Sequence, residues 1–189
     1  RLSVKGDCMS VIYLDMDGVL VDFFGGLAKK YNVDHWKSLK DKDSILVDLR
    51  CTNFFHTLDS FDTSSPLIDY IDHVSVENKL EWGICSTPLV EDEYNSAYWK
   101  RKWLSKNNMI PRNLENLIFT HHKAEYAVSP VDRRPNILID DRPQNVTEFT
   151  NAGGIGIRYQ ANVDDFIEYL IPEVEKAIDI INATPKSSH

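Results

Sequence analysis

Two pairs of aspartates in this chain of 189 residues each follow a short apolar run. Asp15 and Asp17, separated by one residue, come after the first run, and Asp140 and Asp141 are neighbours after a later one. In an open α/β sheet, both pairs would lie beyond the carboxyl ends of the strands, where such sheets bind ligands. Four carboxylates held together raise one another's pKa. A hard divalent cation with oxygen ligands removes that conflict, and Mg²⁺ keeping several waters fits best.

Two further strand ends carry groups that suit a phosphate. Ser86 and Thr87 follow one apolar run, and Lys123 follows another. A hydroxyl, backbone N–H groups and a cation are what a bound phosphoryl group needs. Each feature alone has a simpler explanation, because Asp, Ser and Thr also cap helices and a lysine in a loop can be solvated. The order of acid pair, hydroxyl, lysine and acid pair is what indicates one joint site.

The elements that must position these groups alternate between strands and helices. The apolar runs that have the length of buried strands are 11–14, 81–85, 116–119, 136–139 and 154–157. Helices are expected to start at Ser65-Pro66, Arg142-Pro143, Asp164 and Pro172, and another is expected over 94–104. In the last of these, Trp99 and Trp103 share one face and are expected to pack against the core. Short apolar runs between helix-length segments are typical of parallel strands with crossover helices.

About 65 residues separate the first two expected strands, more than one crossover helix needs. Residues 22–64 are mostly polar with aromatic side chains scattered among them, and we interpret them as a small, mainly helical cap inserted after the first strand. The core would then comprise 9–21 and 65–185, and its expected fold is a three-layer, Rossmann-like α/β arrangement. Residues 1–8 are interpreted as an added or flexible N-terminal segment, with Met9 as a plausible natural start.

Composition and charge narrow the classes of function. Apolar residues make up 42% and charged residues 26%, the ordinary mix of a soluble globular chain. The net charge of −8, from 29 acidic and 21 basic residues, argues against binding of polymeric nucleic acid or of an anionic membrane. No apolar run approaches the roughly 20 residues of a membrane span. Cys8, Cys51 and Cys85 have no metal-ligand spacing, so reduced thiols in the cytoplasm are expected.

The sequence Asp-Met-Asp-Gly-Val-Leu from Asp15, together with Ser86/Thr87, Lys123 and Asp140-Asp141, resembles the four motifs of the haloacid dehalogenase (HAD) superfamily of phosphatases. More narrowly, four segments between Val11 and Pro143 resemble the 5′(3′)-deoxyribonucleotidase family: Asp-Met-Asp-Gly-Val-Leu-Val-Asp-Phe, Asn53-Phe54-Phe55, Ile84-Cys85-Ser86-Thr87-Pro88 and Leu138-Ile139-Asp140-Asp141-Arg142-Pro143. The chain departs from that family at Ser86-Thr87-Pro88, where the family reads Thr-Ser-Pro, and at His121-His122, where Arg-Asp is usual.

The resemblance implies a HAD-like core with a cap, and hydrolysis of a phosphate monoester in two steps. Asp15 would be the nucleophile that attacks phosphorus and forms an aspartyl-phosphate. Asp17 would protonate the leaving oxygen and then deprotonate the hydrolytic water. A carboxylate that approaches a phosphate dianion meets repulsion, which a metal ion and a cationic side chain offset.

The same resemblance implies roles for the remaining polar residues. Ser86 or Thr87 would bind the phosphoryl group, with Ser86 favoured by its position. Lys123 would neutralise the phosphoryl charge and orient the nucleophile. The groups implied to hold Mg²⁺ are Asp15, the backbone carbonyl of Asp17, and Asp140 or Asp141.

Aromatic residues of the cap are candidates for substrate binding. Phe23 lies eight residues after the expected nucleophile, where relatives place a ring against the nucleobase. A base stacked on a ring gains roughly 1–3 kcal/mol. Phe54, Phe55 and Trp36 could complete an apolar slot with Leu89, or they could form the small core of the cap itself.

The resulting prediction is a Mg²⁺-dependent phosphoric monoester hydrolase of the 5′-nucleotidase type. It would act on small (deoxy)nucleoside monophosphates, and not on polymeric nucleic acid or at a membrane. A HAD phosphatase acting on another small phosphate monoester, such as a sugar phosphate, is the alternative. A receiver-like phospho-acceptor domain also clusters aspartates, a hydroxyl and a lysine, but there the first-strand acids are neighbours and no cap intervenes. The small cap and its exposed rings are compatible with a homodimer.

Overall fold

The computed structural model describes residues 9–187, and a five-stranded parallel sheet forms its centre. The strands are β1 (Val11–Leu14), β2 (Glu81–Ser86), β3 (Leu117–Phe119), β4 (Ile137–Asp140) and β5 (Ile155–Arg158). Their order across the sheet is β3-β2-β1-β4-β5. The sheet therefore grows from β1 first in one direction and then in the other, and open sheets bind ligands at such reversal points. The five predicted strands are confirmed, whereas residues 1–8, with Cys8, lie outside the described residues.

β1 is the central strand, and all four of its residues are buried. Leu14 pairs with Ile84 of β2 and with Ile139 of β4. The backbone N–H of Asp15 continues this pairing and donates to the carbonyl of Ile139 at 2.9 Å. The register thus brings the carboxyl ends of three neighbouring strands to one level, so that Asp15 and Asp140 leave the sheet together.

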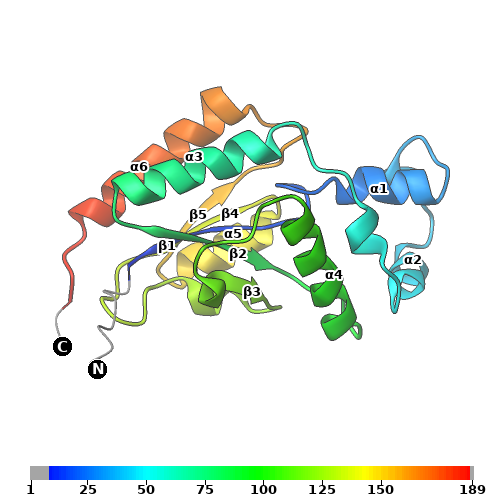
Figure 1. Ribbon diagram of the computed structural model, residues 1–189, viewed down its shortest axis with the longest axis horizontal. Coiled ribbons are helices and arrows are strands. Elements are labelled where there is room, and N and C mark those ends of the chain that lie inside the picture. The colour runs from blue at the N-terminus through cyan, green and yellow to red at the C-terminus, as the bar shows by residue number, and fades with distance from the viewer. Residues whose placement is uncertain (1–8, 188–189) are drawn as a thin grey trace.

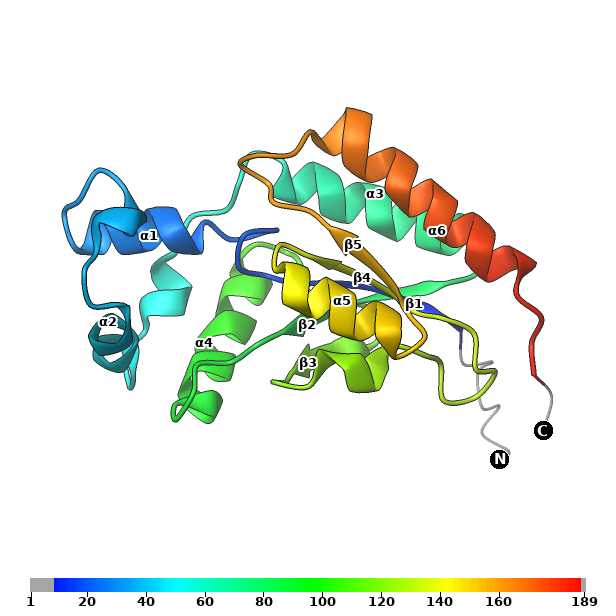
Figure 2. The ribbon, with the colours of Figure 1, turned by 180° about the vertical axis from the view of Figure 1, so that it is seen from behind.

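Helices cover both faces of the sheet (Figures 1 and 2). α3 (Ser64–Glu77) and α6 (Ile171–Ala183) lie side by side on one face, and α5 (Pro143–Asn151) lies on the other. A π-helix, Phe166–Leu170, leads into α6. α4 (Glu93–Lys106) follows β2 and packs against residues 54–57 of the predicted cap. These layers confirm the expected three-layer α/β fold.

Two predicted helix starts have different outcomes. α5 begins at Pro143, as proline at the first helical position predicts. The predicted N-cap at Ser65 is wrong, because α3 begins at Ser64, and Thr63 at its N-cap makes no side-chain capping bond. The hydroxyl of Ser64 donates instead to the carbonyl of Leu20 at 2.7 Å. A contact with the loop after β1 therefore secures this helix start.

The segment predicted as a cap contains helices and no strand among its residues. They are α1 (Phe23–Lys30), η1 (Trp36–Ser38), α2 (Lys42–Leu49) and η2 (Phe54–Thr57). Figure 1 shows α1 and α2 beyond one end of the sheet. The two connections to the core run together, because the N–H of Asp22 donates to the carbonyl of Asp59 at 2.9 Å and Val21 bridges Ser60. The helical content is as expected, and 22–64 as a separate unit stays a prediction.

The hydrophobic core is continuous from the sheet into this segment. Phe54, Phe55 and Leu58 belong to the same cluster of buried apolar side chains as the strand residues. Trp103 of α4 is fully buried, and its Nε1–H donates to the carbonyl of Leu58 at 2.8 Å. Trp99 is half-buried, with its ring centre 5.4 Å from that of His56. In the part of the chain that the structure describes, no helix has the length and apolarity to cross a bilayer.

Candidate active site

A tight turn from Met16 to Val21 follows β1 and contains Asp17. The carbonyl of Met16 accepts hydrogen bonds from the N–H groups of residues 19, 20 and 21 at 3.2, 2.8 and 2.9 Å. Gly18 has a φ of +80°, a backbone conformation that glycine adopts without steric cost. A Cβ on Gly18 would also collide with the carboxylate of Asp141. Glycine therefore permits both the turn and the close approach of the second acid pair.

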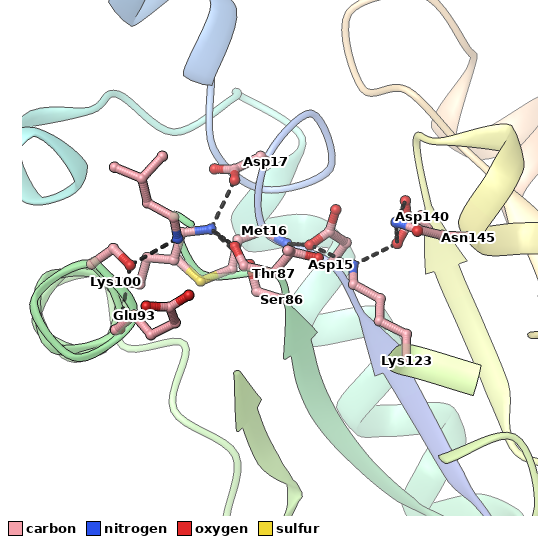
Figure 3. Close-up of polar contacts among 12 residues, drawn as sticks. Asp15, Met16, Asp17, Ser86, Thr87, Glu93, Lys100, Lys123, Asp140 and Asn145 are labelled. Atoms are coloured by element: carbon pink, nitrogen blue, oxygen red, sulfur yellow. Dashed lines mark hydrogen bonds and ion pairs between the residues drawn. The ribbon is translucent and has the colours of Figure 1, made fainter. Parts of the chain in front are cut away.

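Three carboxylates meet at the end of β1 and β4. Asp15, Asp140 and Asp141, the acid cluster, each offer an oxygen within 4.8 Å of the others. The ammonium group of Lys123 lies 3.0 Å from Oδ1 of Asp15 and donates to Oδ2 of Asp140 at 2.6 Å (Figure 3). Asp15, Asp140 and Lys123 are all buried. Of the four carboxylates expected to meet, the structure therefore brings together Asp15, Asp140 and Asp141, whereas the carboxylate of Asp17 is not part of this cluster.

Lys123 does not balance the charge of the three carboxylates, and burial together with this excess raises the pKa values of Asp140 and Asp141. Burial and the charge of Asp15 raise the pKa of Asp140. Burial, followed by the charges of Asp15 and Asp140, raises the pKa of Asp141 to about 8. Burial alone would lower the pKa of Lys123, but the two carboxylates that it contacts outweigh this and raise it. One ammonium group faces three carboxylates, so the cluster suits an additional cation.

The two acids of the second pair differ in how much of their hydrogen-bonding capacity is used. Oδ2 of Asp140 accepts from Lys123 and, at 3.0 Å, from Nδ2 of Asn145. Oδ1 of Asp140 accepts from the N–H of Arg142 at 2.9 Å and from Asn145 at 3.2 Å. For Asp141, no side-chain hydrogen bond occurs with the described residues. Asp140 is therefore held by protein donors, and Asp141 has the freer carboxylate.

The carboxylate of Asp17 lies against a second buried lysine. The ammonium group of Lys100, on α4, donates to Oδ2 of Asp17 at 2.8 Å, to Oγ of Ser86 at 2.9 Å and to the carbonyl of Thr87 at 2.9 Å (Figure 3). Lys100 is only 1% exposed. Burial raises the pKa of Asp17 even though Lys100 opposes that change. Asp17 therefore faces the hydroxyl side of the site with its side chain, and not the acid cluster.

Sequence reasoning missed Lys100. The available signal is its position on α4, because the buried residues of that helix are Ser96, Lys100, Trp103 and Leu104, which share one face at spacings of three and four. A lysine in the buried stripe of a helix needs a partner for its charge. That pattern could have marked Lys100 as a site residue without indicating which acid it meets.

Both predicted hydroxyl residues lie at this side of the site. Ser86 is the last residue of β2 and is fully buried, with its Oγ on Lys100. Thr87 is half-buried, and it meets the same ammonium group through its backbone carbonyl. The next element, α4, starts after Asp92. Ser86 is therefore the hydroxyl in contact with the charged groups of the site.

The predicted substrate-binding aromatic residues pack mostly on one another. The ring of Phe23 lies 5.9 Å from those of Phe54 and Phe55, and it is stacked on the latter. Phe54, Phe55 and Leu89 are buried. The ammonium group of Lys100 lies 4.8 Å above the ring of Phe55. These rings therefore adjoin Asp17 through Lys100. Their packing on one another agrees with the alternative interpretation, in which they form the small core of the cap itself.

Trp36 is connected to that group through Phe24, whose ring lies 5.4 Å from that of Phe23, and it lines a small cavity together with Phe23. Its ring stacks on Phe24 at 4.5 Å, and the ammonium group of Lys42 lies 4.4 Å above it. Trp36 and Phe24 line a cavity of about 460 Å³ that extends to Asp141 and Gln160 of the core. Trp36 therefore adjoins the acid cluster side of the site, and it does not complete a slot with Phe54 and Phe55.

No protein-family model matches the sequence, and no curated protein matches it. Similar solved structures include a HAD-family hydrolase from Deinococcus radiodurans with bound phosphate and sodium, at 11% identity and a TM-score of 0.49 over 79% of this chain and 80% of that chain. A HAD-family enzyme from Bacteroides thetaiotaomicron in complex with magnesium has 13% identity and a TM-score of 0.48 over 87% and 99%. A putative beta-phosphoglucomutase from Thermotoga maritima has 13% identity and a TM-score of 0.44 over 94% and 100%. All three likenesses are distant, so the site is interpreted from the residues of this chain.

Proposed function

We propose that this protein is a Mg²⁺-dependent phosphatase of the HAD superfamily that hydrolyses small phosphate monoesters through an aspartyl-phosphate on Asp15. The observation that carries the proposal is the position of Asp15 between two differently charged sides. Lys123 and two further carboxylates lie on one side, and Ser86, Lys100 and Asp17 lie on the other. A metal ion and a phosphoryl group can therefore both reach one carboxylate.

The residues of the acid cluster fit a magnesium ion. Asp15 and Asp141, with the backbone carbonyl of Asp17, would hold it, and Asp140 would support them from its fixed position on Lys123 and Asn145. Oxygen ligands of this kind suit Mg²⁺, which keeps several waters. When bound, the ion supplies positive charge that offsets the repulsion between a carboxylate and a phosphate dianion.

The side chains would then perform a two-step transfer. Oδ1 of Asp15 already accepts from the N–H of Met16 at 2.8 Å and faces Lys123, which leaves Oδ2 as the attacking oxygen. In the first step a bond forms between Asp15 and phosphorus, the bond to the leaving oxygen breaks, and Asp17 gives that oxygen a proton. In the second step Asp17 takes a proton from water, the water oxygen forms a bond to phosphorus, and the bond between phosphorus and Asp15 breaks, which releases inorganic phosphate and restores Asp15.

For the substrate, we propose (deoxy)nucleoside monophosphates, as in a 5′(3′)-deoxyribonucleotidase. The support is the flanking sequence and the ring of Phe23, which is half-buried beside the residues that meet Lys100. A sugar phosphate is the alternative, since most of the surface of Phe54 and Phe55 is already buried. A cytoplasmic location, which the free thiols of Cys51 and Cys85 fit, and a homodimer stay predictions.

Phosphate release from a panel of nucleoside monophosphates and sugar phosphates, with Mg²⁺ and with EDTA, tests both levels of the proposal. We expect metal-dependent turnover of dUMP or dTMP that Asp15→Asn abolishes. Asp69→Asn, an exposed aspartate of α3, is the matched control and should retain wild-type activity. Turnover of sugar phosphates alone would keep the mechanism and reject the nucleotide, and no metal-dependent turnover of any ester would reject the proposed function.

A further inference from the structure

Lys100 uses all three hydrogens of its ammonium group within the site. Its acceptors are a carboxylate oxygen of Asp17, the hydroxyl of Ser86 and the carbonyl of Thr87, at 2.8 to 2.9 Å. An ammonium group has three donors and no acceptor, so these contacts saturate it. A buried cation is costly to desolvate unless it is paired and hydrogen-bonded. Its contacts are therefore specific, and they join the proposed acid to the proposed phosphate-binding hydroxyl.

We propose that Lys100 is a positioning residue for departure of the leaving group. It holds Oδ2 of Asp17 so that Oδ1 is the oxygen that gives its proton to the leaving oxygen, and it turns the hydroxyl hydrogen of Ser86 toward the phosphoryl group. This inference rests on the proposed function, because it assigns a task within that reaction. It adds a residue that the sequence motifs do not contain.

The two carboxylate oxygens of Asp17 have different surroundings, as this role of Lys100 requires. Oδ2 is held by Lys100, whereas Oδ1 is buried and has no hydrogen-bond partner among the described residues. Leaving a buried polar atom unpaired costs about 1–3 kcal/mol, so such an atom needs an explanation. A leaving oxygen of the substrate would supply the missing partner. Lys100 fixes which of the two oxygens is left for that contact.

The hydroxyl of Ser86 supports the second part. Its oxygen accepts from Lys100, which cannot accept in return, so the hydroxyl hydrogen must point to another acceptor. A phosphoryl oxygen is such an acceptor, and the neighbouring contact of Lys100 with the Thr87 carbonyl fixes the end of β2 where the hydroxyl lies. One ammonium group therefore orients two groups that would act on the same phosphate ester.

α4 holds Lys100 firmly enough for this task. Three residues further on, Trp103 is fully buried and donates to the carbonyl of Leu58. The ring of Phe55 lies 4.8 Å from the ammonium group on the other side. Helix, strand and cap segment thus meet at Lys100, and its side chain has little freedom to move away from Asp17.

Leaving-group dependence separates positioning from a structural role. An alkyl phosphate such as dUMP needs a proton on its leaving oxygen, whereas p-nitrophenyl phosphate expels a stable phenolate with little need for one. We expect Lys100→Met to lower kcat on dUMP by about 10²-fold or more, within the range of general acid catalysis, and on the aryl ester at least tenfold less. Asp17→Asn should show the same selectivity, and Lys100→Met combined with it should add little further loss on dUMP.

Lys102→Met, on the same helix but exposed, is the matched control and should leave both substrates unaffected. Lys100→Gln, which keeps a neutral donor, serves as the second variant if Lys100→Met does not fold, and the same selectivity is expected of it. Equal losses on the two esters in a folded variant would overturn the inference and leave a structural role. If the wild-type protein hydrolyses neither these esters nor any other in the panel, the proposed function itself fails.

Discussion

The two buried lysines of the site have different charge environments. Lys123 faces a cluster of three carboxylates, and the pKa of one of them, Asp141, is raised to about 8. Lys100 meets one carboxylate and two neutral oxygens, so its surroundings are balanced. The first region carries excess negative charge that suits a cation, and the second carries none. Under the proposed function, a metal ion and a phosphate ester would therefore be recognised on opposite sides of Asp15.

Removing Lys123 is expected to have the largest effect on stability and activity. Lys123→Met would leave Asp15 and Asp140 buried without their cation, which typically costs about 3–5 kcal/mol. The free energy of unfolding by urea, measured without metal, should fall by that order, and phosphatase activity should be lost with it. An unchanged urea midpoint would show that Lys123 does not offset the charge of the acid cluster.

Removing a carboxylate should affect activity and stability in opposite directions. We expect Asp141→Asn to lower kcat/KM by about 10²-fold or more at limiting Mg²⁺, because it removes the freer ligand of the cluster. The same change should raise the melting temperature of the metal-free protein at pH 8, because less repulsion remains. A fall in both quantities would mean that Asp141 is a structural residue and not a strained ligand.

The pH dependence of stability should weaken when the metal is added. The pKa of Asp141 is raised in the folded state to about 8, so the folded protein keeps the proton of this carboxyl up to a higher pH than the unfolded chain does. Its contribution is therefore most favourable at low pH and is lost as the pH rises toward 8. The melting temperature in EDTA should fall between pH 6 and pH 8, and the rise caused by Mg²⁺ should be greater at pH 8.

Below about pH 5, protonation of other carboxylates also changes the melting temperature. The comparison is therefore made between pH 6 and pH 8. Asp141→Asn provides the control, since it should flatten the slope in EDTA. An equal effect of Mg²⁺ at both pH values would contradict a metal site that contains Asp141.

The smallest expected effects concern the aromatic residues of the cap. Phe23→Ala should raise the KM for a nucleoside monophosphate by about tenfold, the loss of roughly one stacking contact. Trp36→Ala should change it less, because Trp36 stacks on Phe24, whereas Phe23 stacks on Phe55, the ring that lies beside Lys100. Measuring KM for a sugar phosphate alongside shows whether the effect depends on the base. A larger effect of Trp36→Ala would place the leaving group in the cavity next to Asp141.

Much of the site could be predicted from local sequence because it follows strand ends. The strands are short apolar runs, and Asp15, Ser86 and Asp140 stand at or directly after their ends. Parallel pairing then brings those ends to one edge whatever the details of the helices. Lys123 could be predicted for the same reason, since it follows β3 by only a few residues.

The contacts of Lys100, Asp141 and the aromatic residues depend on tertiary packing and could not be predicted from local sequence. Lys100 is fourteen residues from Ser86 in sequence, and its contact with Asp17 depends on the rotation and docking of α4. Asp140 and Asp141 are equivalent in sequence, but only one lies where Lys123 and Asn145 reach it. Strand ends are determined by local hydrophobic pattern, whereas side-chain partners between distant elements depend on how those elements pack. Local sequence pattern is therefore sufficient to predict the fold class and the position of the acid pairs, whereas packing sets which partner each of them meets.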